Sequence, residues 1–160
     1  MTIKVGDKMP EGVFKIMKSD GPGAYSSKEL FSGRKVVLFS VPGAFTPTCS
    51  KQHLPGFIEK ADELKQKGID AIACIAVNDV FVMGAWGDHS HAGDKVLLLS
   101  DGNGDYTRAL GLELDATGFG MGHRGKRFAM VVDDGVVEQL HVEAPGEFKV
   151  SSAEHILENL

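Results

Sequence analysis

Two cysteines are the residues of this sequence with the clearest capacity for chemistry. Cys49 ends the stretch Val41-Pro-Gly-Ala-Phe-Thr-Pro-Thr-Cys49, and Cys74 lies within a later apolar run. A cysteine acts as a nucleophile only as its thiolate, so the surroundings of each sulfur decide whether it reacts. Two cysteines in 160 residues make a disulfide scaffold a poor explanation, and reactive chemistry is the better one.

The elements on either side of this stretch would place Cys49 at the start of a helix. Residues 35–41 are apolar and rich in β-branched side chains, which predicts a buried strand. Apolar residues then recur at one-face spacing, which predicts a helix over residues 47–67 with Thr46 as its cap and Pro47 at its first position. Cys49 falls in the first turn, where free backbone N–H groups and the helix dipole stabilise a thiolate.

Further short elements are expected around this unit. Residues 1–34 are rich in turn residues and predict a hairpin, followed by a helical turn that Ser27 caps. Pro55-Gly56 lies inside the long helix and predicts a kink there. Two nearly continuous apolar runs, at residues 69–77 and 96–100, predict strands buried on both faces.

The second half combines helices with an antiparallel pair of strands. Asn78-Asp79 opens one helix, and a short helix is expected near residues 104–110. Residues 115–125 carry many glycines and are expected to form a mobile loop. Asp133-Asp-Gly135 predicts the turn of a hairpin, and Ser151-Ser-Ala-Glu154 predicts a capping box at the start of the last helix.

The order of these elements predicts an α/β fold. It implies a central mixed β-sheet flanked by helices, with the N-terminal hairpin as an insertion. The arrangement is compatible with a thioredoxin-like core, and we expect residues 1–160 to form one domain. In open α/β sheets, sites form beyond the carboxyl ends of the strands, and Cys49 is expected at such a place.

Charge and hydropathy argue against several classes of function. The formal net charge of −5 does not favour non-specific binding to nucleic acid. No apolar run approaches the roughly 18 residues that a membrane span needs. The N-terminal residues lack the features of a signal or transit peptide, so a cytoplasmic location is expected.

The stretch Pro42-Gly-Ala-Phe-Thr-Pro-Thr-Cys49 resembles the motif around the peroxidatic cysteine of peroxiredoxins. Its continuation through Ser50-Lys-Gln-His-Leu-Pro-Gly-Phe57 is similar to the type II, peroxiredoxin-5-like subfamily, and the resemblance extends over essentially the whole chain. It implies a thioredoxin-like fold and a thiol peroxidase without metal, haem or flavin. Such an enzyme reduces hydrogen peroxide and alkyl hydroperoxides in antioxidant defence and cell redox homeostasis.

The resemblance implies roles for four residues. Cys49 corresponds to the peroxidatic cysteine, which attacks the peroxide and becomes a sulfenic acid. Thr46 corresponds to the hydroxyl that holds thiolate and peroxide, Arg127 to an arginine from a neighbouring strand, and Pro42 to a shield against water. These types suit the reaction, because a displacement at oxygen needs a thiolate and fixed donors for both oxygens. An arginine fork donates in two directions and keeps its charge, which a lysine does not match.

Cys74 is open to two interpretations. A thiol in a buried strand is inert, but some plant and bacterial type II members carry a second cysteine here that is proposed to resolve the sulfenic acid. Residues 149–152 contain no cysteine, so the resolving cysteine of animal members has no counterpart. A Cys49–Cys74 disulfide needs Cα atoms within about 7 Å, which we do not expect without local unfolding. We therefore expect recycling by glutathione or glutaredoxin, with thioredoxin as second candidate, and the resemblance implies a homodimer.

Two other functions fit parts of the sequence. A thiol–disulfide oxidoreductase on the same fold is disfavoured, because Gln52 stands where the second cysteine of a Cys-x-x-Cys pair would be. A redox sensor would pass the oxidised state of Cys49 to a partner protein. Such a sensor would combine fast oxidation with slow turnover by every reductant.

Three weaker patterns are assigned no function. Residues 101–105 begin like a calcium loop, but Tyr106 and Leu112 replace the required glycine and glutamate. His89 and His91 lack further ligands, so no metal site is predicted.

The third pattern, Gly118-Phe-Gly-Met-Gly122, lacks the strand and helix of a nucleotide loop. With His123, Arg124 and Lys126 it forms either a basic rim that attracts glutathione carboxylates or a solvated loop.

Overall fold

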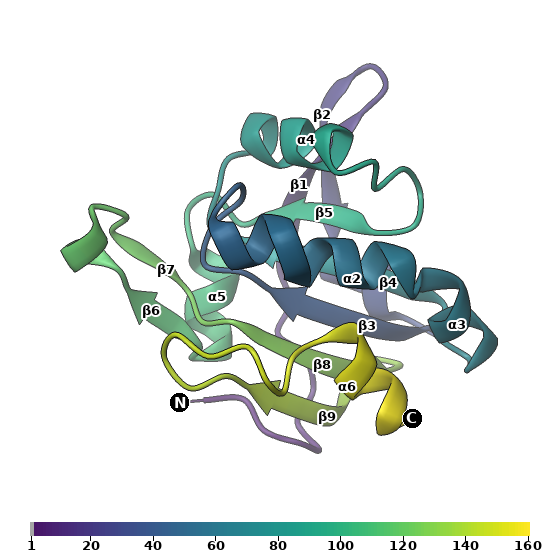
Figure 1. Ribbon diagram of the computed structural model, residues 1–160. Coiled ribbons are helices and arrows are strands. Elements are labelled where there is room, and N and C mark those ends of the chain that lie inside the picture. The colour runs from purple at the N-terminus through teal and green to yellow at the C-terminus, as the bar shows by residue number, and fades with distance from the viewer. Residues whose placement is uncertain (1) are drawn as a thin grey trace.

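A seven-stranded mixed sheet runs through the centre of the protein, with helices on both faces (Figure 1). The computed structural model describes residues 2–160. The strands of the sheet are β1 (Val13–Lys18), β2 (Gly21–Ser26), β3 (Lys35–Ser40), β4 (Ala71–Ala76), β5 (Leu97–Ser100), β8 (Phe128–Asp133) and β9 (Val136–Val142). They lie in the order β2-β1-β5-β4-β3-β8-β9, with β3, β4 and β5 parallel and the outer pairings antiparallel. The predicted fold class and the N-terminal hairpin are confirmed.

The central strands are apolar throughout because both faces of the sheet are buried. On β3, Val37 and Phe39 join one apolar cluster, while Val36 and Leu38 join the other. The first cluster is covered by α2 (Leu54–Glu59), α3 (Ala61–Gln66), α4 (Val80–His89) and α6 (Ala153–Glu158). The second is covered by α1 (Ser27–Phe31) and α5 (Asp105–Leu110). The alternation follows from the two-residue repeat of a strand.

The helix that carries Cys49 is divided differently from the prediction. Helical residues begin at Pro47, but Cys49–His53 wind as a π-helix before α2 starts. The break between α2 and α3 falls at Lys60, and α2 is assigned as one helix through Pro55-Gly56, where the kink stays a prediction. A proline ring clashes with the carbonyl four residues before it, and a widened turn directly ahead of Pro55 is where a helix can accommodate that ring.

Residues 115–125, expected to form a mobile loop, contain more regular structure than a loop. Strands β6 (Glu113–Asp115) and β7 (His123–Gly125) pair antiparallel around a 3₁₀ turn, Thr117–Phe119. Gly120 and Gly122 adopt φ values of 73° and 67°, which side chains other than glycine rarely adopt. The glycines therefore serve the chain reversal, and the β6–β7 ribbon extends away from the central sheet in Figure 1.

Two helix starts are shifted by one residue from the prediction. Ser26, rather than Ser27, caps α1 in a capping box with Glu29. Ser152, rather than Ser151, caps α6, and no capping box forms over residues 151–154. Adjacent serines are equally good caps, so only the packed structure selects between them.

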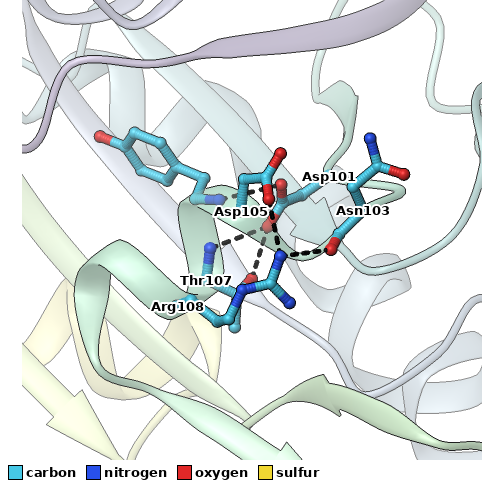
Figure 2. A network of polar contacts seen from close by, with 6 residues as sticks. Asp101, Asn103, Asp105, Thr107 and Arg108 are labelled. Atoms are coloured by element: carbon cyan, nitrogen blue, oxygen red, sulfur yellow. Dashed lines mark hydrogen bonds and ion pairs between the residues drawn. The ribbon is translucent and has the colours of Figure 1, made fainter.

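The loop after β5 leads into the start of α5, where Asp101 binds the helix itself (Figure 2). The buried carboxylate of Asp101 accepts hydrogen bonds from Tyr106 N (3.1 Å), Thr107 N (2.8 Å) and Thr107 Oγ1 (2.8 Å). Arg108 pairs with Asp105 at 2.6 Å on the surface. Residues 2–160 contain no group of three or more metal-ligating side chains. Within the same residues, none of the helices has the length and apolar character that crossing a membrane requires.

Replacing Asp101 tests the importance of this helix start. Asp101→Ala leaves buried N–H groups without partners and is expected to lower the free energy of unfolding by about 1–3 kcal/mol, measured by urea denaturation. Asp105→Ala, which removes an exposed ion pair, is the control, with an expected loss of about 0–1 kcal/mol. Equal effects of the two substitutions would contradict the role of Asp101, and added calcium is expected to leave both midpoints unchanged.

Candidate active site

Cys49 lies in the first helical turn beyond the carboxyl end of β3, as predicted. Its side chain and that of Cys74 are both fully buried, and both thiols are free. Burial alone would describe an inert core thiol. The polar neighbours of each sulfur therefore decide which of the two can react.

Two donors contact the Cys49 sulfur. Arg127 Nη2 lies 3.0 Å from Sγ, and Thr46 Oγ1 lies 2.8 Å from it. A guanidinium and a hydroxyl beside a buried sulfur favour its thiolate, because negative charge on sulfur strengthens both hydrogen bonds. The structure thus brings together three of the four residues that the sequence singled out, in an arrangement suited to a nucleophile.

The Thr46 hydroxyl has a second partner, the carbonyl of Gly43 at 2.7 Å. A hydroxyl has one hydrogen, so Thr46 can donate to that carbonyl beside a neutral thiol and to sulfur beside a thiolate. The side chain does not cap the helix as predicted, since its bonds run to Gly43 and Cys49. The main-chain carbonyl of Thr46 does accept the first helical bond, from Ser50 N–H at 2.9 Å.

Hydrogen bonds from α4 and the residue pair before it hold the turn around Cys49. Asn78 Oδ1 accepts from Ala44 N–H at 2.9 Å, and Trp86 Nε1 donates to Ser50 Oγ at 2.9 Å. Between these contacts Phe45 adopts a φ of 66°, an unfavourable conformation for a bulky side chain. Such strain persists only where surrounding contacts hold it, and it is typical of functional turns.

Arg127 lies directly before β8 and is held at both ends of its guanidinium. Nη2 faces Cys49, while Nη1 lies 2.8 Å from His53 Nδ1. The ring of Phe148 lies 5.8 Å from the guanidinium carbon. None of the ion pairs within residues 2–160 involves Arg127, so no carboxylate competes with a Cys49 thiolate for its charge.

His53 is a site residue to which the sequence assigned no role. It is fully buried, with aromatic rings on several sides: Phe39, Phe57 and Phe148. Burial, together with the charge of Arg127, lowers the pKa of His53 to about 3 against the opposing effects of Ser151 and Glu143. The ring is therefore neutral near pH 7. Its spacing of four residues from Cys49, about one helical turn, is the signal that would have placed it on the same face of the helix as Cys49.

A cleft of about 550 Å³ opens beside Arg127. Its lining includes Pro42, Thr48, residues of the β6–β7 ribbon and residues 143–147. Pro42 is half-buried, and its role as a shield against water stays a prediction.

Residues of the predicted basic rim lie at the same place. Lys126 lines the cleft, whereas Arg124 donates to the carbonyls of Met121 (2.9 Å) and Pro42 (3.2 Å). Arg124 therefore fastens the β6–β7 ribbon to the Pro42 turn, which leaves Lys126 as the rim residue that faces the cleft.

Cys74 lies in β4 opposite Phe39 of β3, in the same apolar cluster as Cys49. Burial, and to a smaller extent the charge of Cys49, raises the pKa of the Cys74 thiol well above its ordinary value. A thiol that stays protonated is a poor nucleophile. The folded structure therefore favours the inert interpretation of Cys74.

Comparisons with known proteins agree with this geometry. The Redoxin family model matches residues 4–157. Peroxiredoxin-2E-2, chloroplastic, from Oryza sativa subsp. japonica is 55% identical over 99% of this chain and 73% of its own length. Peroxiredoxin-2B from Arabidopsis thaliana is 52% identical over 99% of this chain and 98% of its own length.

A solved structure shows the same likeness. Reduced Prx3 from Vibrio vulnificus in complex with H₂O₂ superposes with a TM-score of 0.94 at 51% identity, over 99% of each chain. The fold is therefore the thioredoxin-like fold of the redoxins, as the resemblance implied.

The contrast between the two thiols can be measured directly. After one equivalent of hydrogen peroxide without reductant, intact-mass and peptide analysis is expected to show one added oxygen on Cys49 and an unmodified Cys74, because only Cys49 has donors that favour a thiolate. Oxidation of Cys74 first, or no oxidation while peroxide remains, would contradict the site. Loss of two hydrogens within one chain would show a Cys49–Cys74 disulfide and would overturn the inert interpretation of Cys74.

Proposed function

The chain belongs to the peroxiredoxin family, in its type II branch, and we propose that Cys49 is the residue whose sulfur reduces the peroxide. Peroxiredoxins are thiol-dependent peroxidases, so the protein is an oxidoreductase that reduces peroxides with electrons from thiols and acts in antioxidant defence. The observation that supports Cys49 is the pair of donors on its sulfur, at 3.0 Å from Arg127 and 2.8 Å from Thr46.

The proposed reaction is a displacement at oxygen. The Cys49 thiolate attacks the terminal oxygen of hydrogen peroxide or an alkyl hydroperoxide, so that an S–O bond forms and the O–O bond breaks. The departing hydroxide or alkoxide takes a proton and leaves as water or an alcohol, and Cys49 becomes a sulfenic acid. Arg127 stabilises the thiolate first and then the charge that moves to the departing oxygen. Thr46 supplies the second fixed donor, and Pro42 shields the site from water.

Substitutions at the two central residues test these roles. Cys49→Ser is expected to abolish peroxide reduction. Arg127→Lys is expected to slow oxidation of Cys49 by about 100-fold, because a single ammonium cannot replace a fork that faces both Cys49 and His53. Stopped-flow fluorescence of Trp86, the one tryptophan of the chain, measures the rate. Arg108→Lys on the surface is the control, and an unchanged rate in Arg127→Lys would remove Arg127 from the mechanism.

We further propose that an external thiol recycles the sulfenic acid. Glutathione would condense with Cys49–SOH to give a mixed disulfide and water. A second thiol, from glutathione or glutaredoxin, would then attack the glutathione sulfur, form a new disulfide with it and release the Cys49 thiol. The buried, protonated state of Cys74 supports this route over an internal disulfide. Lys126 at the cleft offers a cation for the carboxylates of glutathione. Thioredoxin stays the second candidate.

Comparing reductants in two proteins distinguishes these routes. Wild type and Cys74→Ser are expected to turn over hydrogen peroxide equally fast with glutathione and glutaredoxin, and faster than with thioredoxin and its reductase. NADPH consumption in coupled assays gives the rates. Loss of turnover in Cys74→Ser, with an unchanged circular dichroism spectrum and unchanged oxidation of Cys49, would make Cys74 the resolving residue. Higher turnover with thioredoxin would reverse the order of the reductants.

A homodimer through the surface near Cys49 is a related proposal. Phe119 is 86% exposed at the cleft, and Phe45, in the turn before Cys49, is 48% exposed. Large exposed aromatic side chains beside a cleft are typical of interaction surfaces. Sedimentation equilibrium that gave the mass of one chain would contradict this proposal.

A cytoplasmic location stays a prediction from the sequence.

A further inference from the structure

Glu143 holds the segment that leads into α6. It follows β9 and is buried, with 8% of its surface exposed. Its carboxylate accepts hydrogen bonds from four donors in residues 149–151: Lys149 N (2.9 Å and 2.8 Å to the two oxygens), Val150 N (2.8 Å), Ser151 N (2.8 Å) and Ser151 Oγ (2.6 Å). Burial raises the pKa of Glu143, but these donors outweigh burial and lower it below the ordinary value. Glu143 therefore stays ionised at neutral pH and fixes the course of this segment.

The segment that Glu143 fixes contacts His53. The carbonyl oxygen of Ser151 lies 2.8 Å from His53 Nε2, and the Phe148 ring lies 5.0 Å from the imidazole. Glu143 also contacts the backbone of Arg127, since its N–H donates to the Arg127 carbonyl at 3.0 Å. One carboxylate thus orients a carbonyl toward the histidine that touches Arg127.

The two contacts of His53 admit a single form of its ring. A carbonyl only accepts hydrogen bonds, so Nε2 must carry a hydrogen that it donates to Ser151. A guanidinium only donates, so Nδ1 must be unprotonated to accept from Arg127 Nη1 at 2.8 Å. The ring is therefore the neutral tautomer with hydrogen on Nε2. In the other tautomer the Nδ1–H would face the N–H of Arg127 Nη1, and the lone pair of Nε2 would face the carbonyl oxygen of Ser151.

We propose that Glu143 is a positioning residue for the peroxidase reaction. Through the Ser151 carbonyl it selects the His53 tautomer that accepts from Arg127 Nη1, and this contact directs Arg127 Nη2 at the Cys49 sulfur. The inference rests on the roles proposed above for Cys49 and Arg127. The Glu143 carboxylate touches neither the sulfur nor the guanidinium, and it acts through residues 149–151 and His53.

The His53 tautomer is the measurement that separates positioning from mere stability. Long-range ¹H–¹⁵N correlation spectra distinguish hydrogen on Nε2 from hydrogen on Nδ1, and His53→Gln identifies the signals. At pH 7 we expect only the Nε2–H form in the reduced wild-type protein. In Glu143→Ala we expect a mixture of both forms and oxidation of Cys49 by hydrogen peroxide that is about tenfold slower, because Arg127 is no longer aimed at the sulfur.

Two further variants complete the experiment. Glu154→Ala removes an exposed negative charge from the first turn of α6 and is expected to change neither tautomer nor rate. Glu143→Gln keeps an acceptor for Ser151 but sets an amide N–H against Lys149 N–H, so we expect a minor second tautomer and about threefold slower oxidation. If Glu143→Ala does not fold, Glu143→Gln decides the question.

The outcomes are distinguishable. A sole Nε2–H tautomer in the folded Glu143 variants, or a mixed tautomer with an unchanged oxidation rate, would overturn the proposal. A mixed tautomer with slower oxidation supports it. Peroxide reduction that persisted in Cys49→Ser would instead overturn the proposed role of Cys49, and it would do so whatever the His53 spectra show.

Discussion

The central constraint on this structure is the placement of fixed hydrogen-bond donors around the fully buried sulfur of Cys49. An ionised group away from water is costly unless fixed dipoles and an opposite charge replace its hydration. Around Cys49 these are the start of a helix, the hydroxyl of Thr46 and the guanidinium of Arg127. The elements that supply them come from distant parts of the chain, and the mixed sheet is what brings β3 and β8 side by side.

The two cysteines show how strongly polar neighbours control reactivity. Both are buried in the same apolar cluster, and neither is in a disulfide. Cys74 lies in β4, where burial keeps its thiol protonated, whereas Cys49 lies where a strand ends and a helix begins. The same chemical group is thus held protonated in one place and faces two hydrogen-bond donors in the other.

The region around Cys49 departs from ideal geometry at several points. A π-helix spans Cys49–His53, and Phe45 has a positive φ. Contacts from Asn78 and Trp86 hold the turn in place, and the Glu143 network holds His53 and, through it, Arg127. Irregular backbone of this kind is concentrated at functional sites because positioning of a reacting atom outweighs local stability there.

The sequence by itself determined the strand–turn–helix unit of Cys49, the hairpins and the two-sided burial of the central strands, because these depend on residues close together in the chain. The motif that ends at Cys49 likewise pointed to Thr46 and to peroxidase chemistry, and the family resemblance along the rest of the chain pointed to Arg127. Only the tertiary structure decided that His53 accepts from Arg127 and that Ser151 and Glu143 orient it, since these contacts join residues 74 and 98 positions apart. Local patterns carry no information about such distant partners. The choice between Ser151 and Ser152 as the cap also depended on packing, because the Ser151 hydroxyl donates to the Glu143 carboxylate and Ser152 is left to cap α6.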